Sequence, residues 1–474
     1  MASTFFGLTI AYSGLQAANT SLTITGHNVS NINTKGYTKQ QAGTQAADAL
    51  RTHTTYGAIG SGVVVTEISQ IRDSYYDVKY RNNMANYGQY SVKESYMGQI
   101  EDYLDEFTLN GYSQEYKNFF SAVNQLTITP GDTSAKNQLI NNAKSLADYF
   151  NTLTTNLRNV QADANNEIKD AVQQINSYAK NIAALNRQIN QIEANYGNAN
   201  DLRDKRNAMI DELSEIVNLE TSEEDMGNNV SNFSVRINGQ TLVSSYSYNT
   251  LETVARTDKK NYSDAEGLYD VQWNSGQKFD MYSTSLSGHL KGLIDIRDGN
   301  NGEHENIETD DDGNNVTDSD GNLVLTTAPA ADKTVSYKGV PYYQAQLNEF
   351  AKIFSDAVNK IMKSGYTSDG SSKGISLFVT QPNTTVMSAG NITVNPELLK
   401  NADLLAIKKE QNDGESDAKI MEELNKLQSE KIFAGGTGSY FLESIVSDMS
   451  IDSQKAVNLY KNCLLYTSDA ADEL

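Results

Sequence analysis

Apolar residues recur every seven positions near the start of the chain, and this spacing predicts a helix from Leu8 to Ile32. A first row holds Leu8, Leu15, Leu22 and Val29. A second row holds Ala11, Ala18, Thr25 and Ile32. One large and one small row is the pattern of a narrow coiled-coil seam. Such a helix is marginal alone in water, so we expect it to pack against partners; a core helix of a globular domain is the alternative.

The segment that follows, HNVSNINTKGYTKQQ (His27 to Gln41), is rich in amides and contains no acidic residue. A local interpretation is that Asn and Thr side chains stop the helix, that Gly36 permits a left-handed turn, and that Tyr37 anchors the exit. A second interpretation follows from the family resemblance given below, which implies assembly: the amides would satisfy polar groups of neighbouring subunits, where a charge would be costly to desolvate. On that interpretation we expect the segment to be disordered in an isolated subunit.

These two stretches together form the candidate assembly surface. It comprises Leu8, Leu15, Ala18, Leu22, Asn28, Val29, Asn31, Ile32, Asn33, Thr34, Gly36 and Tyr37.

Helical periods dominate residues 75–218. Apolar steps of three and four predict a helix from Tyr75 to about Phe107, with tyrosines packed between helices. Residues 113–125 and 134–218 are also predicted to be helical. The strongest period, with isoleucine at 168, 175, 182 and 189, predicts a long helix in an antiparallel bundle. A break precedes a restart capped by Asn200 or Asp201.

The pattern changes near residue 220. Alternating residues around Asn238-Gly239 predict a β-hairpin, and the stretch from Leu286 to Gly299 predicts a short helix ended by glycine. Residues 300–340 are acidic and predict an exposed loop or hairpin. A calcium loop does not fit there, because placing Gly313 or Gly321 at its sixth position leaves other ligand positions unfilled.

The remaining segments predict a mixture of elements. Gly57, Gly60 and Gly62 predict a turn into a strand rather than a nucleotide loop. Residues 342–363 predict a helix, residues 392–407 a strand followed by a turn marked by proline, and residues 417–461 helices broken by AGGTGSY.

Composition narrows the class of protein. The net charge of −22 argues against binding to nucleic acid or to an anionic membrane, and the 38% hydrophobic content indicates an elongated protein with thin cores. The single cysteine, Cys463, excludes a disulfide within the chain. The four histidines show no metal-ligand spacing, and no nucleophile or phosphate-loop motif occurs. We therefore expect no enzymatic activity, no cofactor and no metal.

Several segments resemble one protein family. The stretch from Ser13 to Gln41 resembles the N-terminal signature of flagellar rod, hook and hook-associated proteins. Later segments, in the same order, resemble the hook-associated protein 1 family. They are GSGVVVTEISQIRD, NDLRDKRNAMIDELSEIVNLE, LSGHLKGLIDIRDG and LNEFAKIFSDAVNKIMKSGYTSDGSSKGISLF.

The resemblance implies an extracellular structural protein of the bacterial flagellum. It would be exported by the flagellar type III apparatus with a chaperone and form a homo-oligomeric ring at the hook–filament junction. Its partners would be the hook protein on one side and the second junction protein or filament on the other. Flagellin or hook protein is an alternative identity, and glycan binding or adhesion by the β-rich middle is an alternative function.

The expected fold is mainly α with a β-rich insertion, an elongated α+β chain of several domains. We expect an N-terminal axial domain at 1–50, a helical bundle at 51–222 completed by 341–440, and a β-rich outer domain at 223–340. Residues 441–474 would begin a C-terminal helix. The tail NCLLYTSDAADEL does not match the family's closing helix, which leaves a truncated chain or a foreign tail as alternatives.

Overall fold

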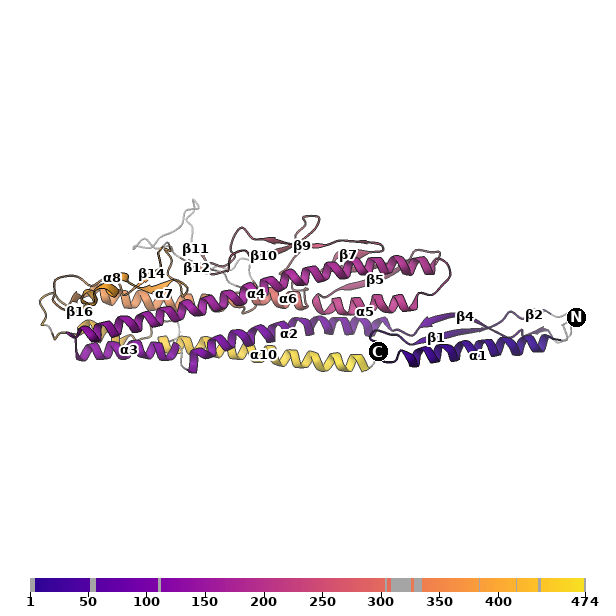
Figure 1. Cartoon of the computed structure of the whole chain (residues 1–474), viewed down its shortest axis with the longest axis horizontal. Helices are drawn as coiled ribbons and strands as arrows, with labels where there is room; N and C mark the ends of the chain where they lie inside the picture. The colour runs from indigo at the N-terminus through magenta and orange to yellow at the C-terminus, as the bar shows by residue number, and fades with distance from the viewer. Residues whose placement is uncertain are drawn as a thin grey trace.

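The molecule is an elongated rod of helices with a thinner extension at one end (Figure 1). The computed structural model describes residues 5–51, 57–109, 112–302, 305–307, 325–327, 335–382, 384–414, 416–433 and 436–472. We call residues 5–70 the arm and residues 74–472 the body. The N-terminus lies at the tip of the arm, and helices run along the body (Figure 1). The elongated, mainly α fold of the α+β class that the sequence predicts is confirmed, and its strands form small sheets.

The arm is one helix packed on a narrow sheet. Helix α1 spans Phe6–Ser30 and lies against β1 (Gln40–Ala46) and β4 (Val63–Gln70), which pair antiparallel. Two short strands, β2 (Leu50–Arg51) and β3 (Ala58–Ile59), pair near the tip. The predicted turn into a strand after Gly62 is confirmed, since Gly62 has a φ of 111° and β4 begins at the next residue.

Long helices build the body, as the apolar periods predict. They are α2 (Ser74–Leu109), α3 (Tyr112–Ile128), α4 (Thr133–Glu193), α5 (Asn200–Ile216) and α10 (Gly438–Asp472). Helix α4 has 61 residues and runs almost the whole length of the body (Figure 1). The isoleucines at 168, 175, 182 and 189 are fully buried along it. Asp132 caps its start by accepting a hydrogen bond from the Ser134 amide.

Small sheets cover one side of these helices. Strands β5 (Glu220–Asp225), β6 (Ser231–Ile237), β7 (Gln240–Ser244) and β8 (Ser247–Tyr248) form one antiparallel sheet. The predicted hairpin is confirmed, because Asn238 and Gly239 join β6 to β7 with φ angles of 50° and 76°. Strands β9 (Leu251–Ala255) and β10 (Tyr269–Trp273) pair separately.

Helix α6 (His289–Asp298) packs against α2 and α4, although strands precede and follow it in the sequence. It ends before Gly299, as predicted. A Cβ at Gly299 would lie 2.2 Å from the Asp295 carbonyl oxygen, so only glycine fits this close approach. Strands β11 (Glu305–Ile307) and β12 (Leu325–Thr327) pair antiparallel, and the tested calcium-loop positions at 308–319 lie outside the described residues.

The far end of the body holds α7 and several short elements. Helix α7 (Val340–Ser364) confirms the predicted helix, and its Phe350 stacks on Phe150 and Phe433 at centroid distances of 5.4 and 4.9 Å. The short elements are β13 (Tyr366–Thr367), β14 (Phe378–Thr380), β15 (Ile392–Val394), α8 (Pro396–Lys400), the 3₁₀ turn Ala402–Leu404, β16 (Ala406–Lys408) and α9 (Lys419–Lys426).

Four local expectations need correction. The stop expected near Ile32 comes earlier, because Asn31 caps α1 after Ser30. Neither Asn200 nor Asp201 caps α5, because the helix already begins at Asn200 and Ala199 holds the cap position without a side-chain hydrogen bond. The turn at Pro396 is a short helix. Helix α10 continues past Lys461 to Asp472 and lies along α2 (Figure 1).

Candidate assembly surface

An exposed apolar row runs along α1. Leu8, Leu15, Leu22 and Val29 are 67, 60, 70 and 66% exposed. Phe5 and Tyr12 extend the row with exposures of 69 and 65%, and Ala11, Ala18 and Thr25 are also exposed. Ile32, 78% exposed, lies beyond the helix end. Large apolar side chains that repeat along one helix face and stay mostly exposed are typical of interaction sites.

The opposite face of α1 supplies the packing within the chain. Ala17 and Ile24 are buried, and Ile10 is half-buried, where the helix lies on β1 and β4. These residues also recur every seven positions, so α1 carries two apolar rows. The sequence prediction identified the exposed row and missed the buried one. Equal periods made the two rows indistinguishable without the strands that cover one of them.

Asn28 joins the end of α1 to the start of β1. Its Nδ2 donates to the Gln40 carbonyl at 2.9 Å, and its Oδ1 accepts from the Gln40 amide at 3.0 Å. The Tyr37 hydroxyl donates to the same Oδ1 at 2.7 Å. Asn28 therefore uses its amide group within its own chain, in the way that a paired strand would engage Gln40.

The rest of the amide-rich segment forms an ordered turn, which corrects the expectation of disorder. Asn31 Nδ2 donates to the His27 carbonyl at 3.0 Å, and Thr34 Oγ1 donates to Asn31 Oδ1 at 3.2 Å. Asn33 is exposed. Gly36 has a φ of 78°, and a Cβ there would lie 2.8 Å from Ala208 Cβ, so glycine is required for both reasons. The local interpretation of the sequence is confirmed.

One face of α5 holds the base of the arm through polar contacts. The Thr38 amide donates to Asp204 Oδ2 at 3.1 Å, Gln40 Nε2 to Asp201 Oδ1 at 3.1 Å, and Lys35 pairs with Glu212 at 3.0 Å. Burial raises the pKa of Asp204, and the hydrogen bonds from Thr38 oppose that rise. We call these contacts the joint. Sequence reasoning missed it, although the spacing of acids at 201, 204 and 212 places them on one helix face.

Arg72 strengthens the joint where the chain returns from the arm to the body. Its Nε pairs with Asp77 at 2.8 Å, its Nη1 donates to Thr38 Oγ1 at 3.3 Å, and its Nη2 reaches Asp211 at 3.4 Å. Burial opposes the charge of this guanidinium, but Asp77 and Asp211 outweigh it and raise the pKa of Arg72. The arm is therefore attached by a layer of hydrogen bonds and ion pairs, mostly to α5.

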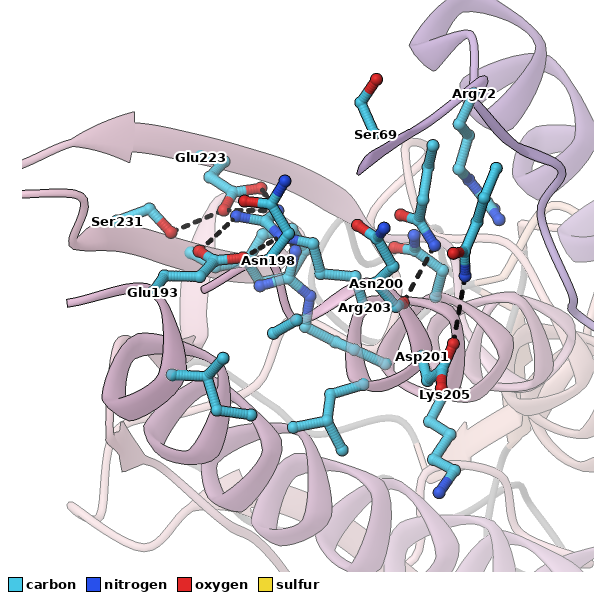
Figure 2. A pocket seen from close by; sticks show the side chains of 18 of the residues that line it. Ser69, Arg72, Glu193, Asn198, Asn200, Asp201, Arg203, Lys205, Glu223 and Ser231 are labelled. Carbon is cyan, nitrogen blue, oxygen red and sulfur yellow. Dashed lines mark hydrogen bonds and ion pairs between the residues drawn. The ribbon is translucent and has the colours of Figure 1, made fainter. Parts of the chain in front are cut away.

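A cleft of about 1950 Å³ opens beside the joint, between β4, α5 and the sheet of β5 and β6. Arg203 lies between Glu193 and Glu223 (Figure 2). Its Nε is 2.7 Å from Glu193 Oε1, and its Nη1 is 3.0 Å from Glu223 Oε1. Burial lowers the pKa of Arg206 to about 10, while Glu223 pairs with it at 3.2 Å. The Arg206 guanidinium lies 3.8 Å from the centre of the Phe233 ring. These charges neutralise one another and hold β5 and β6 on α5.

The described residues contain no group of three or more His, Cys, Asp or Glu side chains placed to hold a metal ion. Within those same residues, no helix is long and apolar enough to cross a membrane.

Comparisons with known proteins agree with this architecture. The family model for the helical domain of the flagellar hook-associated protein FlgK matches residues 97–378. Flagellar hook-associated protein 1 of Bacillus subtilis is 26% identical over 99% of this chain and 90% of its own length. The Salmonella typhimurium protein of that name is 33% identical over 219 residues, which are 46% of this chain and 39% of its own length.

A solved structure shows the same fold. The flagellar hook junction protein FlgK from Burkholderia pseudomallei aligns with a TM-score of 0.63 at 14% identity, over 84% of this chain and 99% of that one. The family model covers more than half of the chain, and the Bacillus subtilis relative aligns along nearly all of it. The chain therefore belongs to the FlgK family of flagellar hook-associated proteins.

Proposed function

We propose that this chain is a structural component of the bacterial flagellum that assembles into a ring on the hook and forms the hook–filament junction. The names of its relatives, hook-associated protein 1 and hook junction protein, support this role. The ring contacts the hook protein on one side and the second junction protein or filament on the other. The function is mechanical, with no catalytic step.

The exposed apolar row on α1 carries this proposal. Burying Leu8, Leu15 and Leu22 against neighbouring copies stabilises the ring by about 1.5–3 kcal/mol for each fully buried side chain. The helix has no Asp, Glu, Lys or Arg between Phe6 and Ser30. A neighbour can therefore cover it without desolvating a charged side chain of this helix.

The proposed route to this location is export through the flagellar type III apparatus with a chaperone. The chain has one cysteine, so no internal disulfide opposes passage of an unfolded chain through a narrow channel. The mature protein would then lie outside the cell, on the flagellum.

The proposal also divides the chain by role. Residues 1–50 would begin the axial domain, residues 51–222 and 341–440 would build the bundle, and residues 223–340 would supply the outer domain. Residues 441–474 would belong to a C-terminal helix.

A double substitution tests the role of α1. Leu15→Asp with Leu22→Asp places two charges in the exposed row, where a covering neighbour would have to desolvate them. We expect the full-length variant to fold and to lose incorporation onto isolated hooks that lack the junction. Sedimentation of hooks with bound protein measures incorporation, and circular dichroism checks the fold.

The control is Gln16→Asp with Thr23→Asp, which adds the same charge to exposed positions of the same two turns. We expect this control to be incorporated. If the Leu15/Leu22 variant binds hooks as well as the control does, the proposed role of α1 is wrong.

A further inference from the structure

The two outer edges of the arm's sheet differ in how many backbone groups they leave free. The Ile71 amide donates to the Lys39 carbonyl at 2.9 Å, which makes Gln40 and Gln70 a non-hydrogen-bonded pair. The amide and carbonyl of Gln40 therefore point outward. The pattern repeats every two residues. The backbone amides and carbonyls of Ala42 and of its partner Ile68 therefore also point outward.

The tip end of the ladder follows the same pattern. The Ala47 amide donates to the Gly62 carbonyl at 2.9 Å, so Ala46 and Val63 form another non-hydrogen-bonded pair. Thr44 and Ala46 on β1 therefore also present their backbone groups outward. The outward positions of β1 are Gln40, Ala42, Thr44 and Ala46.

The outer edge of β4 is blocked at several points. The Ile68 carbonyl accepts from the side-chain amides of Asn198 at 2.9 Å and Asn200 at 2.8 Å. The Val63 amide donates to Ser13 Oγ at 3.2 Å. The register also shifts opposite Gly43 and Thr44, which leaves Thr66 as an extra, bulged residue of β4. Capped groups and a bulge are devices that keep further strands from adding to an edge.

On the outer edge of β1, within the described part of the chain, only the first residue, Gln40, has its outward backbone groups capped. Asn28 occupies the outward groups of Gln40. Among the described residues, the outward groups of Ala42, Thr44 and Ala46 have no hydrogen-bond partner, and Thr44 and Ala46 are exposed. The strand, QQAGTQA, contains no charge and no proline. Such an edge is a template for another strand.

We propose that the outer edge of β1 pairs with an extended backbone segment of a neighbouring copy of this chain. The inference rests on the proposed assembly into a ring and adds a backbone contact beside the apolar one on α1. Both surfaces belong to the same arm, so a neighbour placed against α1 lies within reach of β1.

The distribution of charge favours a second copy as the occupant. Residues 1–70 contain only Lys35, Lys39, Asp48, Arg51 and Glu67, for a net charge of +1. The remaining residues carry 35 basic and 58 acidic side chains, for a net charge of −23. Copies of the arm can therefore approach one another with little repulsion, whereas the bodies repel.

Hydrogen exchange of the wild-type chain tests the pairing directly. In the unassembled protein we expect the amides of Ala42, Thr44 and Ala46 to exchange fast, while those of Gly43 and Gln45 are protected by β4. After incorporation onto isolated hooks, we expect the three outward amides to slow by about tenfold or more. Unchanged exchange at all three in the assembled protein would overturn the inference.

A proline substitution provides the second test. Thr44→Pro removes an outward amide and no ladder hydrogen bond, and the preceding Gly43 tolerates proline after it. Thr44→Ala is the control that keeps the amide. We expect Thr44→Pro to lose incorporation onto hooks and Thr44→Ala to keep it. In both variants the amides of Gly43 and Gln45 should remain protected from hydrogen exchange. Equal incorporation of both variants would overturn the edge pairing.

The two failures can be told apart. If the Leu15→Asp/Leu22→Asp variant is excluded from hooks while Thr44→Pro enters them, ring assembly through α1 stands and the edge pairing is wrong. If the Leu15→Asp/Leu22→Asp variant enters hooks, the proposed role of α1 fails, and the exchange of the β1 amides still decides the edge pairing.

Discussion

Asn28 shows how one side chain can set the course of the chain at the residue scale. An amide can accept and donate at once, so it binds both backbone groups of Gln40 and leaves room for the Tyr37 hydroxyl. No other side chain except glutamine has this pair of groups, and glutamine is one methylene longer. The amides at 28 and 31 therefore serve the turn of their own chain, whereas the leucines of α1 face outward.

Asn28→Asp tests this role. The substitution replaces the Nδ2 donor by an oxygen that faces the Gln40 carbonyl, so an acceptor is left opposite an acceptor. We expect the free energy of local opening at residues 37–41 to fall by about 1–3 kcal/mol. Hydrogen exchange of the Gln40 amide measures the change. Asn33→Asp, at an exposed position of the same turn, should leave that exchange unaltered.

Asp298 is a second residue whose surroundings determine its pKa and its contribution to stability. It is almost fully buried and pairs with Arg256 and Arg297, each at 2.7 Å. Burial opposes its charge, but the two guanidinium groups outweigh burial and hold the pKa of Asp298 well below its usual range. Because folding lowers the pKa of Asp298, its charge stabilises the folded protein at pH values above the pKa of an unfolded aspartate. This stabilisation is lost as the pH falls through the lower pKa of the folded state.

Asp298→Asn should therefore destabilise the body at neutral pH by about 3–5 kcal/mol, because it leaves buried guanidinium groups without their counter-charge. Chemical unfolding at pH 7 measures this loss. The deficit relative to wild type should shrink in strongly acidic solution. Asp163→Asn, at an exposed site on α4, should change the unfolding free energy by less than about 0.5 kcal/mol.

At the scale of elements, sequence periodicity predicted those helices and turns whose signals are local. The isoleucine repeat predicted α4, and Asn238-Gly239 predicted the hairpin of β6 and β7. The pairing of α10 with α2 was not predicted, because a helix period marks an apolar face but does not name the element that covers it. The joint was missed for a related reason: its partners are about 165 residues apart.

The buried apolar row of α4 and the exposed apolar row of α1 should differ in their contribution to the stability of the unassembled chain. Ile175→Ala removes a fully buried side chain of α4 and should lower the free energy of unfolding of the body by about 2–5 kcal/mol. Leu22→Ala, at a position 70% exposed, should change the stability of the unassembled chain by less than about 0.5 kcal/mol. Denaturant unfolding of both variants measures the difference. Equal losses would contradict the exposure of the α1 row.

At the scale of the whole molecule, the arm and the body differ in both charge and packing. The arm is nearly neutral and rests on α5 mainly through Lys35, Thr38 and Gln40, while the acidic body has a continuous core. Composition predicted the elongated shape and the thin core. It could not show that the acids of α5 meet the amide-rich segment, because that contact depends on how the chain returns after β4.

Substitution of the joint should free the arm without unfolding the body. In Asp204→Ala with Glu212→Ala, the Thr38 amide and the Lys35 ammonium lose their partners on α5. We expect a broader distribution of distances between fluorophores placed on the arm and on α4, with the melting temperature of the body unchanged. Lys205→Ala, on the cleft side of α5, is the control. A distribution as narrow as that of wild type would show that the joint does not hold the arm.

The length of α4 has a mechanical consequence. At 1.5 Å per residue, its 61 residues form a rod of about 90 Å that spans the body without a break. A load applied across the molecule therefore bends the body little, and its deformation concentrates where one chain crossing and a layer of hydrogen bonds and ion pairs connect the arm to the body. The molecule therefore combines a stiff helical body with a more flexible connection to the arm. In the proposed ring, the bodies would therefore tilt while the packed arms stay in place.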